Sequence, residues 1–573
     1  MDYNSQLQAA QQQVLSDQLK SEAFDHVTKQ QRRSANYKPN IWKYDFLQSL
    51  RSKYDGQEYK RRTEKLREKV KDMFIEAVDE LATLQLIDMI RKLGLADLFA
   101  DETHKALQAV ASSNKNRKSS EEEEDLYITA LRFRLLRLHG YEVSQDVFNA
   151  FLDEKGIFSV SKCTEIKGLL ELFEASYLAF EGENILEEAK AFSTETLRIV
   201  YSTLGTNLDK QVAHALELPT HWRVQWFDVK WHIIMCENNK NVDKILLELA
   251  KLNFNIVQAT LQKDLSEISR WWRNLGLMEH LNFTRDRLAE SFLCAVGLAY
   301  EPQYSCFRKC LTKITTMILI IDDVYDVYGS LEELEQFTDA VDRWDSSKIQ
   351  QLPGCMKICF QALYDIIIEI SHDIHELNGC DVQVLLHLRK AWAGFCRALF
   401  VEAKWYSEGY TPSLQEYLSN ALISSGGIVI SVHSMLSLGH AVANEMVDFL
   451  GKNQDLVYNI SVITRLCNDL GTSVAEKERG DASSSILCYM REVNASEEKA
   501  REHIKEMITD TWKKINGQCF SNQSPLLQTF VKVTTNVARM VHCLYQFGDG
   551  FGIQDQETRR HILSLLIEPF KLD

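Results

Sequence analysis

The sequence predicts an all-α protein built from two helical domains. Its 573 residues are many for one domain and natural for two or three. Only 7 prolines are present and they are widely scattered, so long stretches of helix-forming residues run uninterrupted. Apolar residues recur at helical spacing along most of the chain, and neither an alternating strand pattern nor an internal repeat is visible.

The first domain is placed at residues 31–234. Residues 1–30, which precede it, are expected to be flexible. The segment 32–50 is interpreted as an extended arm, because a residue that precedes a proline, here Pro39, is disfavoured from helix. From residue 54 to about residue 208 the helical pattern dominates, interrupted by one polar loop.

A Pro-broken, aromatic-rich segment at 216–231 marks the connection to the second domain. We place the boundary at about residue 235 and the second domain at 235–573. Long helical patterns run through this second domain to the C-terminus. Hydrophobic residues make up 45% of the chain, which is enough to build sizeable cores in both domains.

Acidic residues outnumber basic ones by 81 to 65, which gives a formal net charge of −16. This excess repels phosphates, so no nucleic-acid partner is expected. An anionic small substrate would need cations gathered at its site. The 13 cysteines do not form a secreted-type disulfide framework in so long a chain and are interpreted as buried apolar residues.

The first 30 residues contain no apolar signal core and no arginine, whereas a transit peptide is rich in Arg and Ser. No stretch approaches the roughly 18–20 apolar residues that a membrane span needs. We therefore expect a cytoplasmic protein with no membrane partner.

Three aspartates follow an apolar run in the segment "IIDDVYDVYG". Asp322 and Asp326 are four residues apart, which places them on one side of a helix with Asp323 beside them. Carboxylates at this spacing suit Mg²⁺, a hard ion that takes oxygen ligands. Taken alone, the same pattern also fits a solvated helical turn.

A second polar stripe lies in "RLCNDLGTSVAEKERGD". Asn468, Thr472 and Glu476 follow an i, i+4, i+8 pattern, and Arg465 precedes them on the same side. Amide, hydroxyl and carboxylate oxygens are all acceptable Mg²⁺ ligands. The alternative is a polar helix face turned towards solvent.

Arginines in "FTRDRLAESF" supply the cations. Arg285 and Arg287 flank Asp286, and guanidinium groups match phosphate oxygens in pairs. A helix-surface ion pair is the alternative. Together the three segments predict a clamp for a diphosphate ester, whose neutralised leaving group lets a C–O bond break to a carbocation. An apolar, aromatic wall around it, or alternatively ordinary core, is expected from Trp271, Phe292, Ile318 and Tyr545.

With these motifs the chain resembles the plant class I terpene synthases over essentially its whole length. The sequence motifs that match the family are the arm "RRSANYKPNIW", together with "RDR", "DDVYD", "RWW", "YEPQYS" and the Asn468/Thr472/Glu476 stripe. The resemblance implies an N-terminal α-barrel relic that no longer catalyses and a C-terminal class I terpenoid synthase α-bundle. The bundle would bind three Mg²⁺ ions, with Mn²⁺ as an alternative. Neither a D-x-D-D motif nor a second D-D-x-x-D is present, so ionisation chemistry without chain elongation is implied.

The resemblance also implies a role for each matching residue. Those roles are metal ligation by Asp322, Asp323, Asp326, Asn468, Thr472 and Glu476, substrate binding by Arg285, Asp322, Asp326, Arg465 and Asn468, and closure of the mouth by Arg32 and Arg33. The departing diphosphate is expected to be the base, with Tyr545 and Asp549 as other candidates. Arg285 and Arg465 would hold that diphosphate as it leaves.

The resemblance also identifies positions expected to line the substrate pocket, and the residues at these positions point to an acyclic product. Met317 and Thr464 stand where isoprene synthases shorten their pocket with Phe, and Cys294 stands where many cyclising relatives carry Trp. Within the family, "ALISSGGIVI" and "YQFGDGFG" look closest to α-farnesene synthases. The implied reaction converts farnesyl diphosphate into (E,E)-α-farnesene and diphosphate in a monomer, with K⁺ bound by "RGDASSS" as an activator.

Three alternatives stay open at this point. Another acyclic product could form, such as β-farnesene or nerolidol. Geranyl diphosphate could be the substrate and ocimene the product. The chain could also be a non-catalytic helical scaffold descended from such an enzyme.

Overall fold

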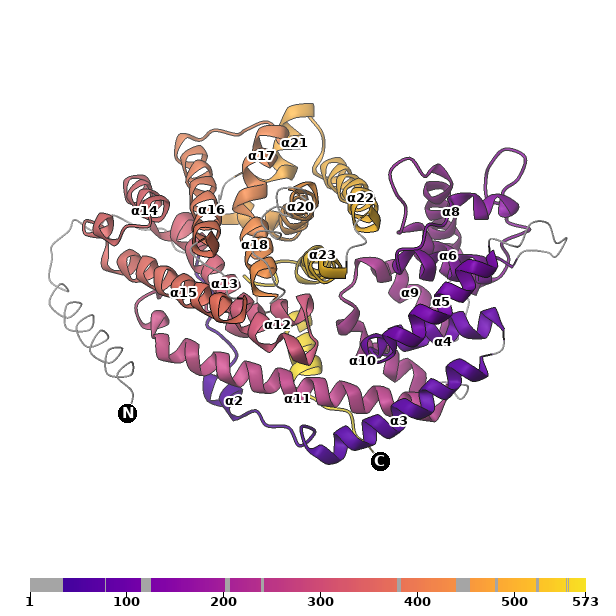
Figure 1. Cartoon of the computed structure of the whole chain (residues 1–573). Helices are drawn as coiled ribbons and strands as arrows, with labels where there is room; N and C mark the ends of the chain where they lie inside the picture. Colours follow the sequence, from indigo (N-terminus) through magenta and orange to yellow (C-terminus); the bar gives the residue numbers. More distant parts are fainter. Residues whose placement is uncertain are drawn as a thin grey trace.

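The computed structural model is helical throughout the residues that it describes, in two halves (Figure 1). It describes residues 35–77, 79–114, 125–200, 207–238, 242–378, 383–438, 454–479, 483–521, 525–552, 554 and 556–572. Among these residues the β pairing consists of one isolated antiparallel bridge, between Leu152 and Phe158. The all-α prediction is therefore confirmed.

The N-terminal half, drawn in indigo to purple, forms one side of the molecule (Figure 1). Its helices are α2 (Tyr44–Ser49), α3 (Gln57–Glu76), α4 (Glu80–Lys92), α5 (Ala100–Asn114), α6 (Leu126–Leu138), α7 (Ile166–Ser176), α8 (Asn184–Val200), α9 (Asn207–Glu217) and α10 (Gln225–Glu237). Short helical turns join them at η1 (Ala96–Phe99), η2 (Gln145–Phe151) and η4 (Thr220–Trp222).

The C-terminal half, drawn in magenta to yellow, carries the predicted chemical residues (Figure 1). Its helices are α11 (Lys244–Leu275), α12 (Leu288–Leu298), α13 (Ser305–Asp323), α14 (Leu331–Arg343), α15 (Gly354–Asn378), α16 (Gln383–Glu408), α17 (Leu414–Ser424), α18 (Gly427–Ser437), α20 (Gln454–Arg479), α21 (Ser485–Val493), α22 (Glu497–Ser521), α23 (Pro525–Tyr545) and α24 (Gln556–Ile562). Shorter turns are η5 (Leu277–Glu279), η6 (Pro302–Tyr304), η7 (Val324–Tyr328), η8 (Ser346–Ile349) and η9 (Leu563–Ile567).

Helix α11 forms the base of the C-terminal half and shows how the sequence sets its ends. The Asp243 side chain caps its start, accepting from the N–H groups of Ile245 at 2.7 Å and Leu246 at 3.1 Å. It ends at Gly276, whose φ of +66° is left-handed and suits glycine. A buried ion pair between Asp264 and Arg308, with Nη2 2.7 Å from Oδ2, fixes α11 against α13.

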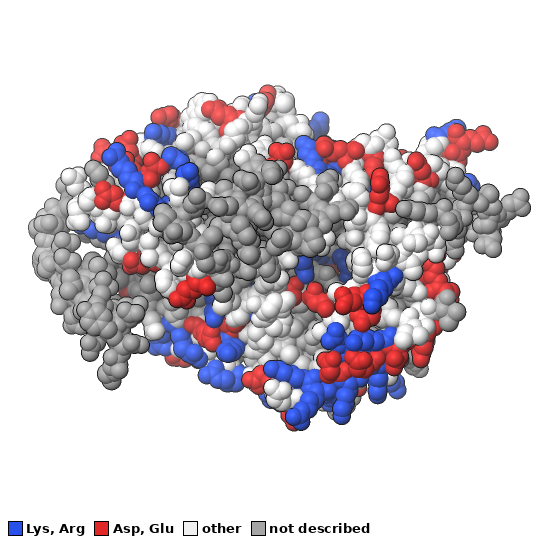
Figure 2. Space-filling view, viewed as in Figure 1, with Lys and Arg blue, Asp and Glu red and all other residues white. Residues whose placement is uncertain are grey.

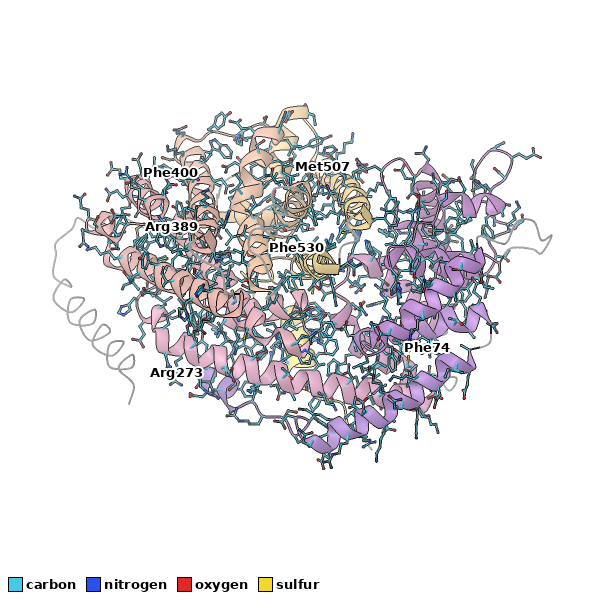
Figure 3. All side chains as sticks on the ribbon, viewed as in Figure 1. Phe74, Arg273, Arg389, Phe400, Met507 and Phe530 are labelled. Carbon is cyan, nitrogen blue, oxygen red and sulfur yellow. The ribbon has the colours of Figure 1, made fainter. Side chains whose placement is uncertain are left out.

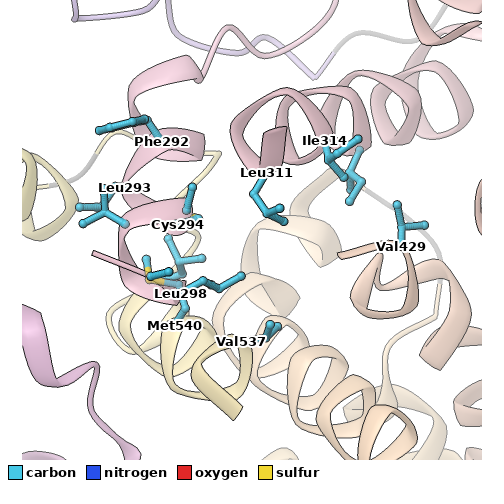
Figure 4. Packing of buried hydrophobic residues seen from close by; sticks show 14 of the residues in the cluster. Phe292, Leu293, Cys294, Leu298, Leu311, Ile314, Val429, Val537 and Met540 are labelled. Carbon is cyan, nitrogen blue, oxygen red and sulfur yellow. The ribbon is translucent and has the colours of Figure 1, made fainter. Parts of the chain in front are cut away.

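One large apolar core joins α11, α12, α13, α15, α16, α20 and α23, and two smaller cores lie within the N-terminal half. Figure 4 shows Leu311 of α13, Val429 of α18 and Val537 of α23 around its interior. Phe530 on α23 is buried, whereas Arg273 near the end of α11 is exposed (Figure 3). This core holds α13 and α20, which bear the two polar stripes, in fixed positions.

The arm and the domain boundary differ in detail from expectation. Residues 35–43 form no helix, as Pro39 predicts, but the non-helical arm does not continue to residue 50, because α2 begins at Tyr44. Position 235 falls within α10, which ends at Glu237, and the next helix, α11, begins at Lys244. The predicted flexible segment 1–30 lies outside the described residues.

The stretch Leu414–Ser437 is long and apolar enough to cross a membrane by length and composition alone, contrary to the expectation that no stretch comes close. It consists of α17 and α18, separated by Gly426 at a φ of +74°. Of an apolar 18-residue segment within this stretch, 61% is buried inside the protein. Burial of this kind is typical of a core helix pair.

Candidate active site

The three aspartates of the first stripe lie where α13 changes its winding. The apolar run before them is buried, and α13 ends at Asp323. A five-residue π-helical turn, η7, follows and contains Asp326. Turns of this wider kind occur often at functional sites. Asp326 is exposed, Asp322 is half-buried, and Asp323 is fully buried. Asp323 therefore points inward, away from the rim that the other two aspartates form.

Arg285 binds both consecutive carboxylates. Its Nη2 atom lies 2.6 Å from Asp322 Oδ2 and 2.9 Å from Asp323 Oδ1, and its backbone N–H donates to Asp323 Oδ2 at 2.7 Å. Burial opposes its charge, yet these carboxylates raise the pKa of Arg285 well above its usual value. Burial outweighs the arginine at Asp323 and raises the pKa of that carboxyl to about 6. Arg285 of R-D-R thus lies against the first stripe, while its expected role in binding the diphosphate stays a prediction.

Tyr37 in the N-terminal arm completes this cluster and was not predicted as a site residue. Its hydroxyl donates to Asp323 Oδ1 at 2.8 Å, and its ring lies 5.1 Å from the Arg285 guanidinium carbon. The arm was expected at the mouth through Arg32 and Arg33, which lie outside the described residues. The sequence feature that could have identified Tyr37 is its position two residues before Pro39, because a proline restricts the backbone conformation of the arm.

Tyr37→Phe is expected to lower kcat/KM about tenfold, because a hydrogen bond to a charged group contributes about 1.5–3 kcal/mol and about 1.4 kcal/mol corresponds to a factor of ten. Steady-state kinetics would measure the change. Tyr54→Phe is the control, since the Tyr54 hydroxyl reaches only the Phe570 carbonyl at 3.3 Å. Equal losses in both variants would contradict a specific role for Tyr37.

The other two residues of R-D-R, Asp286 and Arg287, form hydrogen bonds that fasten the N-terminal arm to the C-terminal half. Asp286 accepts from the Tyr44 hydroxyl at 2.5 Å and from Trp272 Nε1 at 3.2 Å. Arg287 is fully buried, donating to the Lys38 carbonyl at 3.0 Å and to the Phe551 carbonyl at 2.8 Å. Its predicted match to phosphate oxygens is wrong in this structure, because its donors are taken by backbone carbonyls.

The second stripe lies on α20, as its spacing predicts. Thr472 is buried and donates to the Asn468 carbonyl at 2.9 Å. The Asn468 side chain forms a hydrogen bond with Tyr545, whose pKa is raised by burial. Glu476 follows Thr472 by one turn of α20, and its side chain lies outside the described part of the chain. Asn468 and Thr472 therefore share the side of α20 that meets the end of α23.

Arg465, one turn before Asn468, belongs to a buried network that the sequence did not reveal. Its Nη1 atom lies 3.4 Å from Asp469 Oδ1 and 3.3 Å from the Tyr417 hydroxyl. Asp469, fully buried, also accepts from the Ser485 N–H at 2.8 Å. The Nε atom of Arg465 is buried and has no partner among the described residues. An oxyanion at this point would satisfy that donor.

The loop after α23 closes against α20. A Cβ atom at Gly471 would lie 3.0 Å from the carbonyl oxygens of both Tyr545 and Gly548, so only glycine permits this approach. Asp549 Oδ1 accepts from the N–H groups of Phe551 at 3.0 Å and Gly552 at 2.8 Å. Asp549 also lies close enough to raise the pKa of Arg285. The loop therefore links the second stripe to the Arg285 cluster.

The residues present fit a hard divalent cation and an oxyanion. All ligand candidates supply oxygen, and the buried Nε of Arg465 lacks a partner among the described residues. No group of three or more His, Cys, Asp or Glu side chains is arranged for a metal within the described part of the chain, in which Glu476 contributes no side chain. Arg285 contacts the carboxylates of both Asp322 and Asp323, and its single positive charge offsets one of their two negative charges.

The expected wall residues lie in different places. Cys294 is buried on α12, on the side nearer Leu311 in Figure 4, whereas Phe292 points away from Leu311. Trp271 lies beneath Lys313, with Nζ 4.8 Å from the ring centroid. Ile318 is buried, next to Gly426. Cys294 and Ile318 thus remain candidates for the wall, and Phe292 does not.

Comparison with known proteins accounts for this arrangement. Residues 41–216 match "Terpene synthase, N-terminal domain", and residues 273–514 match "Terpene synthase family, metal binding domain". An α-farnesene synthase from Ricinus communis is 60% identical over 98% of this chain and 99% of its own length. An (E,E)-α-farnesene synthase from Malus domestica is 56% identical over 99% and 100%.

A solved structure shares both fold and sequence. Isoprene synthase from grey poplar leaves, in complex with three Mg²⁺ ions and dimethylallyl-S-thiolodiphosphate, has a TM-score of 0.85 and 42% identity. The match covers 93% of this chain and 99% of that one. The helical halves, the paired polar stripes and these full-length matches lead to one conclusion: the chain belongs to the terpene synthase family.

Proposed function

We propose that this chain is a Mg²⁺-dependent sesquiterpene synthase that converts farnesyl diphosphate into (E,E)-α-farnesene and diphosphate. The observation that carries the proposal is the meeting of Arg285 with Asp322 and Asp323 beneath the N-terminal arm. The two α-farnesene synthases that are 60% and 56% identical support the choice of substrate and product.

Two rims would hold the metal. Asp322, Asp323 and Asp326 would bind on one side, and Asn468, Thr472 and Glu476 on the other, with three Mg²⁺ ions proposed and Mn²⁺ as a substitute. Three Mg²⁺ ions are present in the isoprene synthase complex. When bound, the ions would neutralise the diphosphate and improve it as a leaving group.

The two arginines would receive the diphosphate. Arg285 keeps its charge between two carboxylates, which hold it in place, so it would serve as a fixed cation beside the leaving oxygen. Arg465 holds its position through Asp469 and Tyr417, and its unpartnered Nε would donate to an oxyanion. Burial of both groups strengthens these interactions, since water is excluded.

After the C–O bond breaks, loss of one proton from the allylic cation gives the acyclic product. The Tyr545 phenol stays neutral because burial raises its pKa, and a neutral phenol oxygen is a poor base. One carboxylate oxygen of Asp549 accepts two backbone N–H groups. Both facts favour the departing diphosphate as the proton acceptor. Cys294, smaller than a tryptophan, leaves cyclised cations without an aromatic face.

The remaining parts of the proposal concern assembly and activation. We propose a monomer in the cytoplasm with K⁺ as an activator. The K⁺ site would lie at residues 479–485, of which residues 480–482 lie outside the described part of the chain. The loop reaches the Arg465 network, because the Ser485 N–H donates to Asp469. A K⁺ ion there would act on the site through this contact.

Product analysis tests the proposal. The purified protein would be given farnesyl or geranyl diphosphate with Mg²⁺, with and without K⁺, and the headspace analysed by gas chromatography. A dominant α-farnesene peak from farnesyl diphosphate is expected. Ocimene from geranyl diphosphate alone would overturn the substrate, cyclic products would overturn the role of Cys294, and no product from either would indicate a scaffold.

A further inference from the structure

A cavity of about 940 Å³ lies between the two halves, away from the proposed active site. Helices α4 and α5 and the end of α6 line it from one half, and the ends of α12, α22 and α23 line it from the other. Figure 2 shows Lys or Arg atoms in the recess between the halves. Among the described residues, none of the predicted metal ligands or diphosphate-binding arginines lines this cavity.

The cavity wall is strongly cationic. Its charged residues are Arg91, Arg137, Arg223, Lys532 and Arg539 against Asp97. Three of the five cations already have carboxylate partners. Arg137 pairs with Glu183 at 2.5 Å, Arg223 lies 3.6 Å from Asp228, and Lys532 lies 2.5 Å from Glu301.

The other two cations, Arg91 and Arg539, have no ion pair among the described residues. The Arg91 side chain makes no hydrogen bond there either, and Arg539 uses only Nε, to the His221 carbonyl at 2.9 Å, and Nη1, to Asn536 Oδ1 at 2.8 Å. Burial lowers the pKa of each guanidinium to about 10, and the charge of Arg91 contributes to the lowering at Arg539, whereas the Asp88, Glu171 and Glu174 carboxylates act in the opposite direction on the pKa of Arg91. Both arginine side chains are partly exposed, so the N–H groups that they leave unused are open to an anion in the cavity.

The other residues of the cavity wall that we consider are uncharged. His221 is neutral, because burial lowers its pKa to about 3, and its Nε2 bonds to Asn516 Oδ1 at 2.7 Å. Phe180, Tyr300 and Val531 supply aromatic and apolar surface. The volume exceeds what an inorganic anion fills, so there is room for an organic part beside the charged group.

We propose that this interdomain cavity is a second binding site, for a small molecule that carries a phosphate or diphosphate group. Arg91 and Arg539 would bind the anion from opposite halves of the protein, and the apolar wall would receive any attached organic part. Guanidinium groups are the side chains best matched to phosphate oxygens. Two sources share this chemistry: the free inorganic anion and a prenyl diphosphate.

Calorimetric titration with inorganic diphosphate, using the full chain in EDTA, tests the proposal. The wild-type protein and Arg465→Gln, which alters only the catalytic site, are both expected to bind. Arg91→Gln and Arg539→Gln are each expected to weaken binding at least tenfold, while Arg91→Lys keeps most of it. Arg343→Gln is the matched control, since the Arg343 side chain is exposed and pairs with Asp339 on the same helix.

The same titration with farnesyl S-thiolodiphosphate in the Arg465→Gln background separates the two sources. Tighter binding than that of inorganic diphosphate identifies a prenyl diphosphate, and equal binding identifies the free anion. The proposal is overturned if the wild type does not bind, or if Arg465→Gln abolishes binding that Arg91→Gln and Arg539→Gln retain. If either Gln variant fails to fold, the rise in Tm that diphosphate causes would be compared between the wild type and Arg91→Lys. A rise that is present in the wild type and absent in Arg91→Lys would also overturn the proposal.

Discussion

Turnover of farnesyl diphosphate is expected to fall at least 1,000-fold when Asp322 and Glu476 are both replaced by alanine. The two residues belong to the two proposed metal-binding stripes, so the double variant is expected to weaken metal binding on both sides of the diphosphate. Metal ions stabilise transition-state charge by several kcal/mol, and a loss on the order of 4 kcal/mol corresponds to about 1,000-fold. Headspace product yield at saturating Mg²⁺ would measure the change.

The control for this experiment is a pair of exposed carboxylates on other helices. Glu335→Ala with Glu502→Ala removes the same number of charges from exposed positions on α14 and α22. This control is expected to keep full turnover, and both proteins should keep the helical signal in far-UV circular dichroism. Turnover that survives in the Asp322/Glu476 variant would show that the metal ligands are assigned incorrectly.

Asp264→Ala is expected to destabilise the protein by about 3–5 kcal/mol, because it leaves Arg308 buried without its carboxylate partner. Arg308 is fully buried, and its Nε and Nη2 atoms lie 3.0 and 2.7 Å from Asp264 Oδ2. The pair joins α11 to α13, the helix that ends at Asp323, one of the proposed metal ligands. Urea unfolding followed by circular dichroism would measure the loss.

Glu267 provides the matched comparison, since it lies three residues along the same helix. Its carboxylate pairs with Lys309 at 2.9 Å, and both side chains are about one-third exposed. Glu267→Ala is expected to cost at most about 1 kcal/mol, because exposed ion pairs contribute little. A loss equal to that of Asp264→Ala would mean that burial does not set the strength of these pairs.

The parts of the site that follow a helical period could be predicted from sequence. Asp322 with Asp326, and Asn468 with Thr472, are four residues apart, and that spacing alone places each pair on one side of a helix. The widening of α13 into a π-helical turn at Asp326 could not be predicted, because the tertiary packing around it decides the winding.

Contacts between distant segments could not be predicted either. The hydrogen bond from Tyr37 to Asp323 joins residues 286 positions apart, and no local pattern encodes it. Asp469 follows Asn468 directly, so it must face another side of α20, but only the packing of α17 places Tyr417 there to meet it. The interdomain cavity likewise exists only once both halves are folded.

The position of Arg287 affects how chimeric proteins can be made by exchanging domains between members of this family. One guanidinium holds the Lys38 carbonyl of the N-terminal arm and the Phe551 carbonyl of the C-terminal loop. The arm is therefore part of the catalytic mouth, although it precedes the N-terminal domain in the chain. A chimera cut at the linear domain boundary would exchange this piece of the mouth along with the donor domain. To transplant a C-terminal half with its product profile intact, residues 35–44 must travel with it.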